Sequence, residues 1–116
     1  MAEAFARTYG SDVLIPASAG LAPASNVAAE TVSAMAEKNI DMSDQFPKSF
    51  RQLRRVKFDL VVNMSGLPIP WENGVATQEW PVPDPITMGY QDHCQVRDQI
   101  ETLVMKLILD LRRKQP

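Results

Sequence analysis

The stretch Phe58-Asp59-Leu60-Val61-Val62-Asn63-Met64 decides the fold class of this chain. It is mostly apolar and holds two adjacent β-branched residues, which is typical of a strand buried on both faces of a parallel sheet. Two shorter apolar runs also predict strands, one around Val13-Leu14-Ile15 within residues 12–18 and one from Val75 to Trp80. The sequence therefore predicts a sheet of three strands.

Two helices are predicted in the first third of the chain. Residues 1–9 are rich in alanine, and Gly10 follows them as a C-terminal cap. Residues 27–38 carry apolar side chains at helical spacing, and Asn39 is expected to end this helix in a left-handed conformation.

Two further helices lie on either side of the later strands. Ser49 and Gln52 form a capping box that opens a short helix to about Arg55. Residues 91–113 form the longest helix, with one apolar stripe and a polar side that includes Arg97. Helices that alternate with strands predict an α/β fold of three layers, α-β-α, around a short parallel sheet. The functional site of such a sheet lies at the carboxyl ends of its strands.

The composition indicates one small cytoplasmic domain over residues 1–116. A net charge of −2 and a pI near 5.3 argue against a general binder of nucleic acid or of anionic membranes. The longest apolar runs are only a few residues long, so no transmembrane helix is predicted, and the first residues lack the features of a signal peptide. The single cysteine, Cys94, excludes an intrachain disulfide and a zinc site built from two cysteine pairs.

Several segments match one known family when they are taken together and in order. They are Met1 to Arg7, Ser18-Ala19-Gly20, Asn39 to Ser43, Lys48-Ser49-Phe50, Phe58 to Val62, and Trp80 with Pro83-Asp84-Pro85. This order resembles the low-molecular-weight protein tyrosine phosphatase superfamily, including its thioredoxin-coupled arsenate reductase branch. The resemblance covers nearly the whole chain, although no single segment is specific.

The resemblance implies a phosphatase-like fold whose chemistry depends on residues outside this sequence. In the family, the first strand leads into a loop of Cys, five residues, Arg and Ser. Its thiolate attacks phosphorus or arsenic, while the loop amides and the Arg hold the oxyanion. By the resemblance, Met1 falls about three residues after that Arg. We therefore expect a truncated domain without its first central strand, in which Met1 is an internal methionine taken as the start codon.

Asp84 is the catalytic candidate that the resemblance leaves in this chain. The family's Asp-Pro aspartate protonates the leaving oxygen and later activates water. Pro81, Pro83 and Pro85 predict a rigid loop over residues 81–90 that would hold such an acid. From the motif alone a plain Asp-Pro turn is the commoner interpretation, whereas the resemblance places Asp84 at the general-acid position.

Other residues have a functional and a structural interpretation. Cys94, at the start of the last helix, is either a nucleophile or, more simply, a partly buried structural cysteine. Adjacent side chains on a helix point about 100° apart, so His93 and Cys94 are not expected to form a metal pair. Trp71 and Tyr90 either border the substrate cleft that the resemblance implies or pack in the core or at its rim. Three arginines form either an anion patch or a solvated helix face: Arg51, Arg54 and Arg55.

Three functions follow as hypotheses. The first is a phosphatase-like protein, inactive as given, whose full-length relatives hydrolyse phosphate monoesters such as phosphotyrosine. The second is a non-enzymatic interaction module, a homodimer or higher oligomer, because a missing central strand leaves strand edges unpaired. The third is a reductase of the arsenate oxyanion, which needs resolving cysteines where Asn63-Met64-Ser65-Gly66 has none. No cofactor and no metal are expected.

Overall fold

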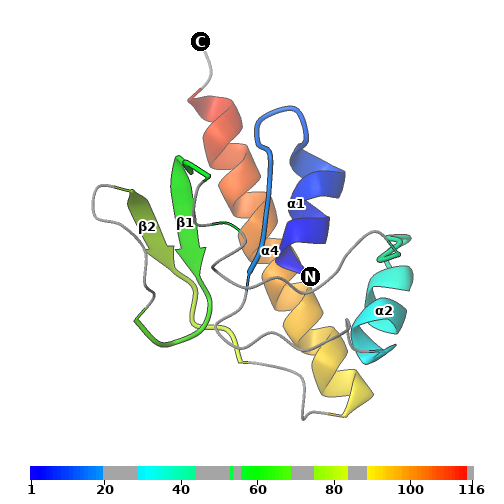
Figure 1. Cartoon of the computed structure of the whole chain (residues 1–116). Coiled ribbons are helices and arrows are strands. Elements are labelled where there is room, and N and C mark those ends of the chain that lie inside the picture. Colours follow the sequence, from blue (N-terminus) through cyan, green and yellow to red (C-terminus); the bar gives the residue numbers. More distant parts are fainter. Residues whose placement is uncertain (20–28, 44–52, 54–55, 69–74, 84–88, 115–116) are drawn as a thin grey trace.

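The structure is a computed structural model that describes residues 1–19, 29–43, 53, 56–68, 75–83 and 89–114. The elements with described bounds are α1 (Ala2–Gly10), α2 (Ala29–Ala36), β1 (Leu60–Asn63), β2 (Ala76–Glu79) and α4 (Tyr90–Arg113), as Figure 1 shows. The three longer predicted helices, over residues 1–9, 27–38 and 91–113, are confirmed within the described residues. The predicted short helix from Ser49 to Arg55 lies outside the described residues, except for Leu53, which is helical.

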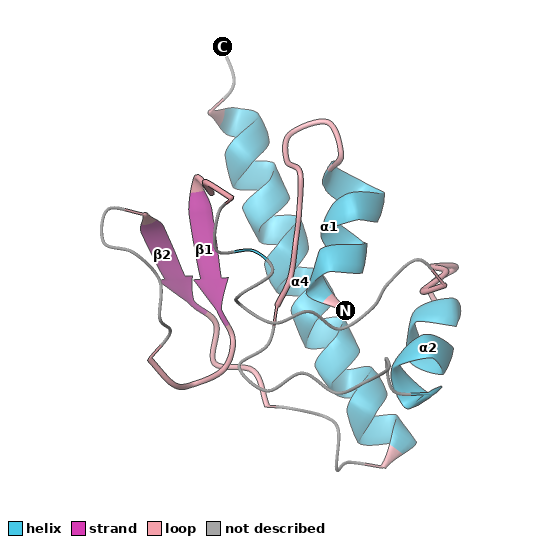
Figure 2. Ribbon diagram, in the orientation of Figure 1, coloured by secondary structure: helices cyan, strands magenta, loops and turns pink. Residues whose placement is uncertain are grey.

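β1 and β2 form a two-stranded parallel sheet within the described residues. Leu60 pairs with Ala76 and Asn63 pairs with Glu79. Just beyond this ladder, the backbone N–H of Trp80 donates to the carbonyl oxygen of Asn63 at 3.0 Å. The two arrows point the same way in Figure 2, so both carboxyl ends lie at one edge of the sheet. The pairing confirms the predicted α/β class and the strands predicted around residues 58–64 and 75–80.

The strand predicted within residues 12–18 is wrong. The backbone N–H groups of Val13 and Leu14 both donate to the carbonyl oxygen of Gly10 at 3.0 Å, so the chain turns directly after α1. Residues 14–18 then continue without regular secondary structure, and Ile15 is 94% exposed. An apolar run becomes a strand only when another strand pairs with its backbone. The described residues provide no such partner for this segment.

α4 is the centre of the fold, because α1 and α2 both pack against it (Figure 1). One apolar cluster connects these helices to Trp80, which directly follows β2. Its buried members are Ala4, Phe5, Ala6, Met35, Ile40, Met42, Trp80, Val96, Ile100, Val104 and Ile108. The described part of the chain contains no helix that is both long enough and apolar enough to cross a membrane.

The prediction that Gly10 caps α1 is wrong, because Gly10 is its last helical residue and Ser11 follows in a right-handed conformation. The glycine instead permits close packing. A Cβ at this position would lie 2.7 Å from Cγ1 and 2.8 Å from Cδ1 of Ile108, which is fully buried on α4. The small residue therefore sets the distance between α1 and α4.

The end of α2 follows the prediction. Asn39 has a φ of 60°, in the left-handed region. Its N–H donates to Ala36 at 2.9 Å, and the N–H of Ile40 reaches back to Met35 at 3.1 Å. This is the Schellman pattern, in which a left-handed residue lets the chain satisfy the last carbonyl groups of a helix. Ile40 and Met35 are both buried, and this apolar contact normally accompanies the motif.

Candidate functional site

The carboxyl ends of β1 and β2 carry a polar cluster centred on Asn63, which is 5% exposed. The side-chain amide nitrogen of Asn63 donates to the carbonyl oxygen of Leu67 at 2.7 Å and to the carboxylate of Glu79 at 3.3 Å. Its amide oxygen accepts bonds from the backbone N–H of Ser65 at 3.0 Å and from the Ser65 hydroxyl at 2.7 Å. These bonds satisfy a buried amide and fix the turn at the edge where parallel sheets place their sites.

Trp80 directly follows β2 at this edge and stands four positions before Asp84 in the sequence. The Trp80 side chain is buried, and its backbone N–H is bonded to the Asn63 carbonyl oxygen. The described chain continues as far as Pro83. Asp84 lies in the range 84–88, outside the described residues, so its general-acid role stays a prediction.

The first turn of α1 holds a buried carboxylate. Glu3 accepts a hydrogen bond from the Ser18 hydroxyl at 2.7 Å and pairs with Arg7 at 2.9 Å. The first contact brings the segment after α1 back to the start of that helix. Burial lowers the pKa of the Met1 amino group, and the charge of Glu3 partly offsets this effect.

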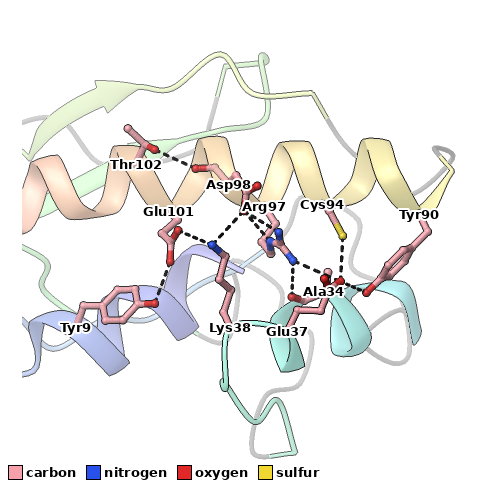
Figure 3. A network of polar contacts seen from close by, with 10 residues as sticks. All are labelled: Tyr9, Ala34, Glu37, Lys38, Tyr90, Cys94, Arg97, Asp98, Glu101 and Thr102. Carbon is pink, nitrogen blue, oxygen red and sulfur yellow. Dashed lines mark hydrogen bonds and ion pairs between the residues drawn. The ribbon is translucent and has the colours of Figure 1, made fainter.

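A second polar cluster joins α2 to the first turns of α4 (Figure 3). The Glu37 carboxylate, just after α2, accepts hydrogen bonds from the Tyr90 hydroxyl and from the Cys94 thiol, the latter at 3.4 Å. Nη1 of Arg97 lies 3.6 Å from the same carboxylate. The bond from Tyr90, followed by that from Cys94 and the charge of Arg97, holds the pKa of Glu37 below its ordinary value. The same contact raises the pKa of Tyr90.

The prediction that Arg97 lies on the solvent side of the last helix is wrong. Its side chain is 8% exposed. Nη1 donates to the Ala34 carbonyl oxygen at 2.9 Å, and Nε donates to Asp98 at 2.8 Å. The polar side of α4 is buried here because α2 packs on it and supplies acceptors for the guanidinium donors.

The same network continues toward α1. Lys38 Nζ lies 3.2 Å from Glu101 and 3.5 Å from Asp98. Glu101 also accepts the Tyr9 hydroxyl at 2.9 Å, as Figure 3 shows. Burial, and then the hydrogen bond to Glu101, raise the pKa of Tyr9. One row of α4 side chains therefore ties both other helices to it.

Cys94 and His93 both have hydrogen-bond partners within the fold. Cys94 is partly buried, and its thiol donates a hydrogen bond to the Glu37 carboxylate. His93 is 2% exposed, and its Nε2 shares a hydrogen bond of 2.9 Å with the Thr31 hydroxyl. The Tyr90 hydroxyl donates a hydrogen bond to Glu37, and its place beside a substrate cleft stays a prediction. Within the described residues, no group of three or more His, Cys, Asp or Glu side chains is placed to hold a metal ion.

Several predicted site residues lie outside the described ranges: Arg51, Arg54, Arg55, Trp71 and Asp84. Two residues that organise these clusters, Glu37 and Asn63, were not predicted from the sequence. Asn63 had a usable signal, because it is a polar residue at the carboxyl end of the strongest strand. Glu37 had none, because its partners on α4 lie 53 and 57 positions away along the chain.

Comparison with known proteins identifies the family to which this chain is similar. The sequence profile of the low molecular weight phosphotyrosine protein phosphatase family matches residues 1–116. A curated relative, the glutaredoxin arsenate reductase of Synechocystis sp., is 30% identical over 112 residues, which cover 93% of this chain and 85% of the relative.

Solved structures give the same result. An arsenate reductase in a phosphate-binding state superposes with a TM-score of 0.83 at 27% identity, covering 95% of this chain and 86% of the other. An arsenate reductase from Archaeoglobus fulgidus superposes with a TM-score of 0.79, covering 92% and 86% of the two chains; its identity of 21% supports the fold alone. Because the family profile spans all 116 residues, the chain belongs to the low molecular weight phosphotyrosine protein phosphatase family.

Proposed function

We propose that this chain contributes the general-acid part of an active site that hydrolyses phosphate monoesters. Asp84 donates a proton to the leaving oxygen, and its carboxylate then activates the water that releases phosphate. The thiolate nucleophile and the oxyanion-binding Arg come from a Cys-x5-Arg loop that these 116 residues do not contain. Their single cysteine, Cys94, is followed six positions later by Ile100 instead of Arg. On its own, the chain is therefore inactive.

The family membership carries this proposal. A member of the family is expected to bind a tetrahedral oxyanion, and one structural relative is described in a phosphate-binding state. The chain toward Asp84 leaves the sheet at the carboxyl end of β2, beside the ordered Asn63 turn. That is where a parallel sheet places its functional groups. A reducing compartment keeps a thiolate nucleophile available, so we propose a cytoplasmic location and one domain over residues 1–116.

Hydrolysis fits the thiol content of this chain better than arsenate reduction does. Hydrolysis transfers a phosphoryl group to a thiolate and then to water, and it consumes no electrons. Reduction of arsenate to arsenite needs two electrons, which a thiol relay supplies by forming a disulfide. The relatives named above are arsenate reductases, yet the turn after β1 reads Asn63-Met64-Ser65-Gly66 and offers no thiol.

The test is turnover of p-nitrophenyl phosphate. We expect none from the 116-residue chain. If the codons before Met1 encode a strand and a Cys-x5-Arg-Ser loop in frame, the extended protein should be active, and Asp84→Asn should lower kcat by about 10²–10⁴-fold. Turnover by the 116 residues that Asp84→Asn abolishes would refute the proposed inactivity. A stop codon directly before Met1 would refute the extended enzyme.

A second candidate is an oligomeric interaction module. Among the described residues, β1 is paired on one side only, by β2. Residues 14–18, which have no regular secondary structure, expose Ile15. The unpaired side of β1 favours association with another chain, so we propose a homodimer or higher oligomer. Light scattering should then show a mass that rises with concentration, and a clean monomer at high concentration would contradict this candidate.

A further inference from the structure

α2 buries little apolar surface for a helix that packs on another helix. Ala34 and Met35 are the buried residues among its eight, whereas α1 buries five of its nine, including Phe5, which is fully buried. An isolated helix of this length is marginal in water, and helices in proteins are stabilised mostly by packing. The attachment of α2 therefore depends strongly on its polar contacts with α4.

These polar contacts run from the first half of α2 to the turn that follows it. Thr31 Oγ1 shares a hydrogen bond of 2.9 Å with Nε2 of His93 on α4. Glu37 and Lys38, directly after α2, reach α4 with a negative and a positive charge (Figure 3). The contacts at the end of α2 therefore depend on charge, and a change of pH alters them.

The Glu37 carboxylate connects the end of α2 to three donors on α4. It accepts hydrogen bonds from the Tyr90 hydroxyl and the Cys94 thiol, and it lies 3.6 Å from Nη1 of Arg97. The same nitrogen donates to the Ala34 carbonyl oxygen at 2.9 Å. Because the Glu37 side chain is 53% exposed, it can take up a proton while the two helices remain packed.

Asp98 supports the same interface from the α4 side. It accepts a hydrogen bond from Nε of Arg97 at 2.8 Å, and it lies 3.5 Å from Nζ of Lys38. Burial opposes its ionisation, but the hydrogen bond and charge of Arg97, and then Lys38, hold the pKa of Asp98 below its ordinary value. The hydrogen bond from Tyr90 is the main cause of the same effect on Glu37. Both carboxylates therefore hold their partners best when they are ionised.

We propose that protonation of Glu37 and Asp98 releases α2 from α4 while α1 stays packed, which makes α2 an acid-sensitive element of the fold. A carboxylate with a lowered pKa stabilises the folded state above its ordinary pKa, and this stabilisation is lost as the pH falls through the lowered value. α2 has little apolar contact to compensate for that loss. Its release would uncover Met35 and the guanidinium of Arg97, which are both buried in the packed state.

Other ionisable groups face these two carboxylates. The charge of Asp98 opposes the lowering of the Glu37 pKa, and Lys38 Nζ also lies 3.2 Å from Glu101. His93, which is 2% exposed, lies in the same interface beneath α2. Because these groups can also change charge, the release is assigned to Glu37 and Asp98 by variants as well as by pH.

The experiment is amide hydrogen exchange followed by NMR at about pH 6 and about pH 3, on either side of the ordinary carboxyl pKa values. Rates are corrected for their intrinsic pH dependence. The amides of Asn39 and Ile40 report on α2, because they donate to carbonyl oxygens of its last turn. Those of Val104 and Ile108 report on the core around α4. The α2 amides should be the less protected pair, and their protection should fall about three- to tenfold toward pH 3.

The double variant Glu37→Gln with Asp98→Asn removes both charges and keeps the side-chain shapes. It should lower the protection of Ile40 at about pH 6 and lack the further fall toward pH 3. Asp12→Asn is the matched control, since the Asp12 carboxylate is 57% exposed and is also bonded to an arginine of α4, Arg112, at 2.9 Å. This control should leave Ile40 unchanged, because the bond lies on the α1 side.

Three results would overturn the proposal. Equal protection of the two pairs of amides in the unaltered chain would show that α2 opens only with the whole fold. Persistence of the full fall in the double variant would show that other groups cause it. Loss of the fall in Asp12→Asn would show that it does not arise at the interface between α2 and α4.

Discussion

Gly10→Ala tests the closest approach between α1 and α4. The new Cβ would stand 2.7 Å from Cγ1 and 2.8 Å from Cδ1 of Ile108, inside normal van der Waals contact. Ile108 is fully buried, so it cannot turn into solvent to make room. Either the side chain leaves its preferred rotamer or the two helices move apart.

Two opposing effects set the size of the change. Overpacking of this kind costs about 1–3 kcal/mol. Alanine is favoured over glycine by up to about 1 kcal/mol inside a helix, and by less at its last residue. We therefore expect Gly10→Ala to lower the free energy of unfolding by roughly 1 kcal/mol and the Tm by about 4 °C.

A double-mutant cycle measured by urea unfolding isolates the steric cause. Ile108→Ala removes all three atoms near the new Cβ and by itself costs about 2–5 kcal/mol. In that background Gly10→Ala should become neutral or stabilising, which gives a coupling energy of about 1–3 kcal/mol. Gly89→Ala is the control, because its Cβ meets nothing within 4 Å. Gly10→Ala that destabilises both backgrounds equally would refute the packing argument.

Three further predictions concern stability. Asn39→Gly should stabilise the chain by a few tenths of a kcal/mol and Asn39→Ala should destabilise it by about 1 kcal/mol, because only glycine adopts the left-handed conformation of 60° without steric cost; thermal unfolding of the pair checks this order. Met35→Ala should cost about 2–5 kcal/mol, since Met35 is fully buried, whereas Val32→Ala on the exposed side of α2 should stay within about 0.5 kcal/mol in denaturant unfolding. Arg112→Ala should lower stability at neutral pH by removing two hydrogen bonds to Asp12 and one to the Tyr9 carbonyl oxygen. Because the hydrogen bond from Arg112 lowers the pKa of Asp12, the part of this difference that is due to Asp12 is present above the ordinary aspartate pKa and should be lost as pH falls through the lowered one. A difference that does not shrink between neutral pH and pH 2 would contradict this account.

Local sequence patterns predicted the elements that show helical periodicity or a strongly apolar run. Residues 58–64 have the composition of a buried strand, and α1 and α4 follow helical periodicity, so each was found. The strand predicted around Ile15 does not form, because a strand needs a neighbouring strand to pair with. No local sequence pattern indicates whether that neighbour is present. Its 94% exposure shows how little an apolar run alone decides.

The residues of the candidate site also fall into those that a local pattern indicates and those that depend on distant partners. Asp84 was predicted from a short motif within the family resemblance and stays a prediction. Asn63 could have been predicted from its place at the carboxyl end of the strongest strand. Arg97 was placed wrongly, because periodicity assigns a polar residue to solvent unless its acceptors are known. Two of those acceptors, the Ala34 carbonyl oxygen on α2 and the Glu37 carboxylate just after it, are far away in the sequence.

The central position of α4 has a consequence for biosynthesis. The bonds from Tyr9 to Glu101 and from Arg112 to Asp12 join residues 92 and 100 positions apart. During synthesis, α1 and α2 therefore emerge from the ribosome well before α4, the helix that covers them, has been made. Phe5 and Met35, both fully buried in the finished fold, remain available to chaperones or to other nascent chains until α4 emerges. A pause in translation before Tyr90 would prolong that exposure, because the core of this protein closes only when its last helix arrives.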